Sequence, residues 1–131
     1  MVTIFIADDS RLFREALARV LTSVKGVQVV GQAFTGKEAL NSIRLLRPDV
    51  VILDLFMPEM NGLEVLRTMR CEAISSMVLV VTNHASPYVR DASIRAGADY
   101  FLDKSFEYQQ IAPILESLVI VLSDKNEFIG H

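Results

Sequence analysis

The sequence lacks several features that mark particular classes of protein. It has a single cysteine, Cys71, which can neither form an internal disulfide nor make a thiolate metal site alone. We therefore expect a reduced thiol in a cytoplasmic protein, with Cys71 as a packing residue. An excess of positive charge is also missing, because 13 Lys and Arg face 16 Asp and Glu, for a formal net charge of −3. This balance argues against direct nucleic acid binding and against binding to anionic membranes.

Long apolar runs and linkers are missing as well. No run approaches the roughly 18 residues that a membrane span needs. The N-terminal stretch MVTIFIADDS has no basic residues before its apolar run and reaches acids at Asp8, so it does not fit a secretory signal. No repeat or Pro/Gly/Ser-rich linker divides the 131 residues, of which 51% are hydrophobic. We expect one domain with a sizeable core over residues 1–124 and a short tail over 125–131.

Five short apolar runs predict β-strands. They are rich in branched side chains, and the third and fourth lack polar alternation, as strands buried on both faces do. These runs cover residues 2–7, 27–33, 50–53, 77–81 and 100–102.

Segments with helical spacing lie between the strands. The first has an apolar stripe that we expect to face the core, with Ser10 as its N-cap and Gly26 at its end. That stripe consists of Leu12, Phe13, Ala16, Leu17, Val20, Leu21 and Val24. The second stripe consists of Ala39, Leu40, Ile43 and Leu46, and further helices are predicted at 62–70, 86–96 and about 106–123. This fivefold alternation predicts an α/β fold with a parallel sheet covered by helices on both faces.

Polar side chains follow the ends of four predicted strands. Asp8 and Asp9 end the first, Asp54 the third and Thr82 the fourth, while Lys104 follows the fifth. In a doubly wound sheet the functional crevice lies beyond these carboxyl ends. If the first and third strands are neighbours, about 4.8 Å apart, the three carboxylates meet, and at roughly 6 Å each pair repels by about 3 kcal/mol. We expect Lys104 and a Mg²⁺ ion to offset that repulsion.

In this order, these residues closely resemble the receiver domain of two-component response regulators. The match consists of the acid pair at 8–9, the block DLFMPEMNG at 54–62, Thr82 after an apolar strand, and GADYFLDK ending at Lys104. It extends over residues 2 to about 123. The resemblance implies a flavodoxin-like, doubly wound, five-stranded parallel sheet in the order 2-1-3-4-5, with five helices. Residues 1–124 would then form a receiver domain.

The resemblance also implies roles for individual residues. Asp54 would be the phosphoacceptor, which attacks the phosphoryl group of a phosphohistidine to give an acyl phosphate. Asp9, Asp54 and the backbone carbonyl of Phe56 would bind Mg²⁺ directly, and Asp8 would reach it through water. Lys104 would pair with a phosphoryl oxygen and offset its charge.

A second group of residues would switch or tune the domain. Thr82 and Phe101 match the switch pair, whose movement repacks the surface of the fourth helix, fifth strand and fifth helix. His84 occupies a position that tunes dephosphorylation. Asn83 departs from the small residue usual there and would narrow access to the acceptor. Phe56 stands where polar residues that orient water are frequent, so we expect slow hydrolysis of the acyl phosphate.

One backbone feature departs from the family pattern. Relatives usually have proline after the conserved lysine, often with a cis peptide bond, whereas Lys104 precedes Ser105. Since a cis bond before a residue other than proline costs about 2.5 to 4 kcal/mol, we expect this bond to be trans.

Partners and competing functions follow from the same resemblance. The expected phosphoryl donor is a sensor histidine kinase or a phosphotransfer protein. The target is a downstream protein or a fused output domain, so the chain is either a stand-alone receiver or part of a longer regulator. The run LVIVL at 118–122 is apolar all round, which fits either a buried helix or an exposed surface for a homodimer.

Two other functions use the same residues. A small Mg²⁺-dependent aspartyl-phosphate phosphohydrolase would need an Asp-x-Asp motif and a cap domain, whereas this chain has Asp8 next to Asp9. A degenerate receiver would serve as a constitutive interaction module, and only Asn83 favours it. Taken alone, Asp8 or Asp9 could cap a helix and Phe101 could be a core aromatic residue. We expect a phosphoacceptor rather than an enzyme that turns over a separate substrate.

Overall fold

The computed structural model describes residues 1–129, with side chains described for residues 1–123. Strands and helices alternate along the chain, and one 3₁₀ turn, η1, precedes the last helix. The elements are β1 (Val2–Ala7), α1 (Arg11–Leu21), β2 (Val27–Ala33), α2 (Gly36–Leu46), β3 (Val50–Leu53), α3 (Gly62–Cys71), β4 (Met77–Thr82), α4 (Pro87–Arg95), β5 (Tyr100–Asp103), η1 (Tyr108–Gln110) and α5 (Ile111–Ile129).

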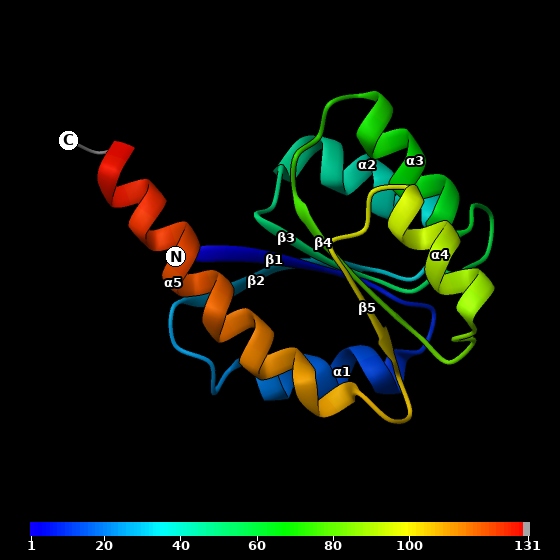
Figure 1. The fold of residues 1–131 in the computed structure, drawn as a ribbon, viewed down its shortest axis with the longest axis horizontal. Coiled ribbons are helices and arrows are strands. Elements are labelled where there is room, and N and C mark those ends of the chain that lie inside the picture. Colours follow the sequence, from blue (N-terminus) through cyan, green and yellow to red (C-terminus); the bar gives the residue numbers. More distant parts are fainter. Residues whose placement is uncertain (130–131) are drawn as a thin grey trace.

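All five strands are parallel and lie in the order β2-β1-β3-β4-β5. This confirms the predicted doubly wound, flavodoxin-like α/β fold with five helices. Helices α1 and α5 cover one face of the sheet, and α2, α3 and α4 cover the other (Figure 1). Alternate residues of each strand enter opposite cores, as Ile52 does on the α1/α5 side and Val51 on the other.

Local sequence signals define where the helices begin. The side chains of Ser10, Asn61 and Ser86 each accept a hydrogen bond from a backbone N–H in the first turn of α1, α3 and α4. Such N-caps satisfy donors that a helix leaves unpaired. Asn61 and Glu64 form a complete capping box, which fixes the start of α3 immediately after the loop that follows β3.

Three side chains expected in the core are exposed instead. Leu12 is 79% exposed, because about two and a half helical turns separate it from the buried Leu21 and place it on the opposite side of α1. Leu46 is 45% exposed at the last residue of α2, and Cys71 is exposed at the last residue of α3. The interpretation of Cys71 as a packing residue is therefore wrong.

The last helix differs from its expected bounds. The helix that we expected from about 106 is preceded by the 3₁₀ turn at Tyr108–Gln110 and begins at Ile111. It continues through residues 125–129, which we expected to form a tail. The domain boundary at 124 stays a prediction, and Gly130 and His131 lie outside the described residues. No helix in the described part of the chain is both long enough and apolar enough to cross a membrane.

Two glycines hold the loop after β3 close to its neighbours. A Cβ on Gly36 would collide with the backbone carbonyl of Met60, and one on Gly62 would collide with the backbone carbonyl of Asp54. The N–H of Gly62 also donates to Leu55 O at 2.8 Å. Because backbone atoms cannot yield as the end of a flexible side chain can, any larger residue at these positions must shift the loop.

We expect Gly62→Ala to lower the free energy of unfolding by about 1 to 3 kcal/mol, because the new methyl group would push the backbone at Asp54. Urea denaturation measures the change. Lys37→Ala, at an exposed helical position, is the control and should leave stability nearly unchanged. Equal stability of Gly62→Ala and the wild type would contradict the predicted collision.

Candidate functional site

The predicted site residues begin where the central strands end. Ala7 pairs with Leu53 at the last step of the β1/β3 ladder, and the next residues are Asp8 and Asp54. The N–H of Asp54 donates to Ala7 O at 2.9 Å, and that of Asp8 donates to Ala33 O at 3.0 Å. Both carboxylates are thus attached to backbone that the sheet holds rigidly.

The three predicted metal-binding carboxylates form one cluster. Asp8, Asp9 and Asp54 each place a carboxylate oxygen within 4.8 Å of the other two. Asp8 and Asp54 are buried, at 1% and 6% exposure, whereas Asp9 is exposed. Within the cluster, solvent therefore reaches Asp9, whereas Asp8 and Asp54 are covered by protein.

Lys104 supplies the positive charge next to the cluster. Its N–H donates to Thr82 O at 2.9 Å, which fixes the start of the side chain beside β4. Its Nζ lies 2.7 Å from Asp8 Oδ2, 3.5 Å from Asp54 Oδ2 and 4.1 Å from the centroid of the Phe13 ring. The ammonium group is therefore held between two carboxylates and an aromatic face.

Burial dominates the electrostatics of Asp8. It raises the pKa of this carboxyl above its ordinary value, and the charge of Asp54 adds to the effect. Lys104 and a hydrogen bond from the N–H of Ser10 act in the opposite direction without cancelling it. A negative charge on Asp8 is thus costly, and additional positive charge in the site would stabilise it.

The predicted switch and tuning residues differ in burial and in contacts. Thr82 is fully buried, and its Oγ1 accepts a hydrogen bond from the N–H of His84 at 3.2 Å. The rings of Phe56 and His84 are in contact, with centroids 4.2 Å apart and planes at 53°. Phe56 is 48% exposed, and Asn83 is exposed. Phe101 is 6% exposed, so its ring already lies inward.

A family model for the response regulator receiver domain matches residues 4–116 of this chain. The chain belongs to the response regulator receiver domain family. It is 35% identical over 119 residues to the Bacillus subtilis (strain 168) transcriptional regulatory protein YvfU, covering 91% of this chain and 60% of YvfU. It is 40% identical over 118 residues to the response regulator MprA of Mycolicibacterium vanbaalenii, covering 90% of this chain and 50% of MprA. The chain thus spans half to three fifths of these curated relatives.

Solved receiver domains have the same architecture. The signal receiver domain of the putative response regulator NarL from Mycobacterium tuberculosis superposes with a TM-score of 0.83 at 33% identity, covering 90% of this chain and 95% of that domain. The response regulator domain of Thermotoga maritima CheB gives 0.79 at 29% identity, covering 91% and 93%. Receiver domains belong to two-component systems, in which histidine kinases or phosphotransfer proteins are the partners.

The residues of this receiver domain fit the Mg²⁺ ion that receiver domains use. The donors are all oxygen atoms, which suits a hard divalent cation. The buried Asp8 Oδ2 receives no well-aligned hydrogen bond from a described residue. Its contact with Lys104 Nζ is an ion pair. Asp8, Asp9 and Asp54 would hold the ion, which would bring positive charge to phosphoryl oxygens when bound.

Sequence reasoning missed two contributors to the receiver site. Phe13, assigned only to the core stripe of α1, contacts the ammonium of Lys104, and Arg14 Nη1 donates to the backbone oxygen of Asp8 at 2.6 Å. Neither has a distinctive motif; their only signal is a position four and five residues after Asp9. The described peptide bonds include no cis bond, so the prediction of a trans bond between Lys104 and Ser105 is confirmed.

We expect Asp8→Asn to raise the free energy of unfolding of the metal-free protein at neutral pH. The raised pKa means that ionised Asp8 costs more in the folded than in the unfolded chain. This cost is absent below the ordinary pKa of 3.8, grows as pH rises from there to the raised pKa, and is complete above it. Lys104 keeps Asp54 as a partner in the variant.

Urea denaturation at about pH 3 and about pH 7, with a chelator present, measures the effect. The variant should match the wild type at the lower pH and exceed it at the higher one. A variant less stable than the wild type at neutral pH would mean that Asp8 is a net stabilising charge.

Proposed function

We propose that this receiver domain is a phosphorylation-driven switch, in which Asp54 accepts a phosphoryl group from a phosphohistidine of a sensor histidine kinase or phosphotransfer protein. The observation that supports this most is the position of Lys104 Nζ, 2.7 Å from Asp8 and 3.5 Å from Asp54. A fixed ammonium beside a buried carboxylate is suited to a group that gains negative charge on phosphorylation. We place this reaction in the cytoplasm.

The proposed reaction balances as a simple transfer. A carboxylate oxygen of Asp54 forms a bond to phosphorus while the bond from phosphorus to the donor histidine nitrogen breaks, and the imidazole leaves with the electron pair and takes up a proton. Lys104 would then move its charge toward the phosphoryl oxygens. The N–H of Phe56, 3.4 Å from Asp54 Oδ1, is a further donor on the acceptor side. No separate substrate is turned over.

The proposed switch passes from the acceptor to the α4/β5/α5 surface. The Thr82 hydroxyl accepts a bond from His84, and we propose that it leaves this donor for the phosphoryl group. Phe101 lies on the neighbouring strand β5, where it pairs with Val80, and Arg90 Cζ is 5.8 Å from its ring centroid. Because the ring already lies inward, the step we propose at Phe101 is its retention there, with repacking of α4 around it.

The output surface would include the apolar side of α5. Ile120 and Val121 are 64% and 59% exposed, so the apolar run at 118–122 is not fully buried. Exposed aliphatic side chains on a helix favour a docking surface. We propose that this surface serves a second copy of the chain, a downstream protein or an output domain.

We expect incubation with acetyl phosphate and Mg²⁺ to add one phosphoryl group to the wild-type protein. Intact mass spectrometry measures the addition. Asp54→Asn and a chelated sample should remain unmodified, because the first lacks the acceptor and the second lacks the charge that opposes repulsion between donor and cluster.

The control for Asp54→Asn is Asp49→Asn, which alters a partly buried carboxylate at the opposite end of β3 and should leave phosphorylation intact. Failure of the wild type to react with acetyl phosphate or with any histidine phosphodonor would instead favour a constitutive interaction module. Modification of Asp54→Asn would place the acceptor elsewhere.

Phe56 is proposed to protect the acyl phosphate from water. Its ring contacts that of His84 with centroids 4.2 Å apart, and Phe56 itself offers no polar group that could orient water. We expect Phe56→Asn to shorten the lifetime of the phosphorylated form by at least about threefold, which corresponds to lowering the hydrolysis barrier by at least about 0.7 kcal/mol.

Loss of the phosphoryl group after removal of the donor, followed by intact mass, measures this lifetime. Leu45→Asn removes a comparable exposed apolar side chain from α2, where it is 85% exposed, and should leave the lifetime unchanged. An unchanged lifetime in Phe56→Asn would show that this ring does not control access of water.

A further inference from the structure

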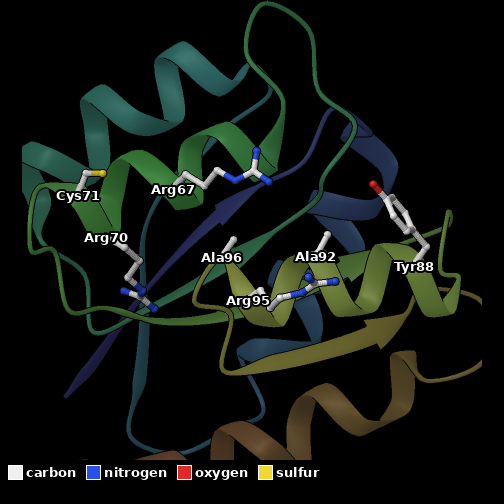
Figure 2. Close-up of a pocket in the computed structure, with 7 residues that line it drawn as sticks. All are labelled: Arg67, Arg70, Cys71, Tyr88, Ala92, Arg95 and Ala96. Carbon is white, nitrogen blue, oxygen red and sulfur yellow. The ribbon is translucent and has the colours of Figure 1, made fainter.

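A groove of about 650 Å³ lies between α3 and α4, away from the carboxylate cluster. Its lining contains three arginines and no acidic residue, in a protein whose net charge is −3. Figure 2 shows the side chains of Arg67 on α3 and of Tyr88 and Arg95 on α4 around this space. The basic groove, as we call it, is lined by Arg67, Arg70, Cys71, Tyr88, Ala92, Arg95 and Ala96.

The three arginines of the basic groove differ in what already binds them. Arg70 donates to the backbone oxygens of Gly97, Ile74 and Ser76 and pairs with Asp99 at 3.3 Å, so its role is to hold the end of α3 against neighbouring loops. Its charge is largely committed to that structural role.

The other two arginines can bind a ligand. Among the described side chains, Arg95 pairs only with Asp91, one turn away on the same helix, and both are more than 70% exposed. Such exposed ion pairs contribute little to the stability of the fold, so Arg95 can pair with a ligand instead. Arg67 forms no ion pair or hydrogen bond with the side chains that the structure describes. Carboxylates that enter the groove could therefore pair with these two guanidinium groups without disturbing the fold.

A smaller apolar pocket of about 220 Å³ adjoins the basic groove. The two spaces share Tyr88 and Ala92, and so form one continuous surface along α4. The apolar pocket is lined by Leu55, Phe56, Asn61, Leu63, Tyr88, Val89 and Ala92. One end of this surface thus accepts an apolar side chain, and the other end accepts negative charge.

We propose that the basic groove and the apolar pocket together bind a short acidic segment of a partner protein. One apolar side chain of the segment enters the pocket beside Tyr88, and its carboxylates face Arg67 and Arg95. Charge complementarity with the arginines requires a negatively charged segment. The apolar pocket distinguishes this segment from a polyphosphate chain, which has no group to fill that pocket. This surface is separate from the exposed part of α5.

The surface is also connected to the acceptor loop. Phe56 and Asn61 line the apolar pocket, and the N–H of Phe56 faces the Asp54 carboxylate at 3.4 Å. If Asp54 is the phosphoacceptor, as proposed above, phosphorylation would alter the pocket and hence the affinity for the segment. Binding itself requires no phosphoryl group, so it is tested first on the unphosphorylated chain.

The probe is an array of short synthetic peptides, in which acidic residues flank a leucine or phenylalanine. Each has two matched versions, one with lysines in place of the acids and one with serine in place of the apolar residue. We expect the acidic, apolar peptides to bind at least about tenfold more tightly than both versions. Arg67→Glu should weaken that binding by about fivefold or more, and Lys25→Glu, an equal charge change at an exposed position in another loop, should not.

Cys71 provides a second readout, because this only cysteine of the sequence is exposed at the edge of the groove. A bound peptide should slow its modification by a thiol reagent. Ala92→Phe fills the junction of groove and pocket and should abolish both binding and protection, while circular dichroism checks that each variant is folded.

Four results would overturn the proposal. These are equal binding of all peptide versions, equal loss in Arg67→Glu and Lys25→Glu, Arg67-dependent binding of a single-stranded oligonucleotide in place of the peptides, and self-association through Arg67 without peptide binding. A protein that binds acidic, apolar peptides but fails to react with phosphodonors would support this surface and contradict the proposed function.

Discussion

The interaction on which the site depends is the repulsion among three carboxylates at one edge of a parallel sheet. At separations within 4.8 Å and an effective dielectric constant near 20, each ionised pair repels by at least about 3.5 kcal/mol. The positive charge of Lys104 opposes this repulsion. Lys104 follows β5, which is two strands away from β3 in the sheet, and its backbone N–H donates to Thr82 O. The cluster therefore requires the completed sheet, because no local segment contains both the acids and the cation.

The two cores make this arrangement possible. The central strands are buried on both faces, so the backbone that carries Asp8 and Asp54 is fixed by hydrogen bonds and by packing on either side. Gly36 and Gly62 then allow the loop after β3 to approach α2 and the backbone of Asp54 more closely than any other residue would. The rigid sheet and the close approach that the glycines allow hold two buried carboxylates next to each other. The stability of the rest of the fold offsets the free-energy cost of their repulsion.

The loop after β3 separates two chemically different regions. On one side are the carboxylates and Lys104, where charge must be balanced when a ligand arrives. On the other side is the apolar pocket, which continues into the basic groove between α3 and α4. Phe56 belongs to both, through its backbone N–H toward Asp54 and its ring beside His84. If Asp54 is the acceptor, as we propose, a change there would reach α4 through Phe56 as well as through the proposed route by Thr82 and β5.

The sequence by itself determined the strands, their buried character, the helix starts at Ser10 and Asn61 and the order of the site residues, because each depends on neighbours within a few positions. Tertiary structure alone decided which apolar residues are covered: Leu12 and Cys71 are exposed, and Phe13 contacts Lys104. It also decided that arginines of α3 and α4 meet in one groove. The reason is that helical periodicity defines the sides of a helix, whereas coverage of each side depends on elements that are distant in sequence and are placed only when the sheet forms.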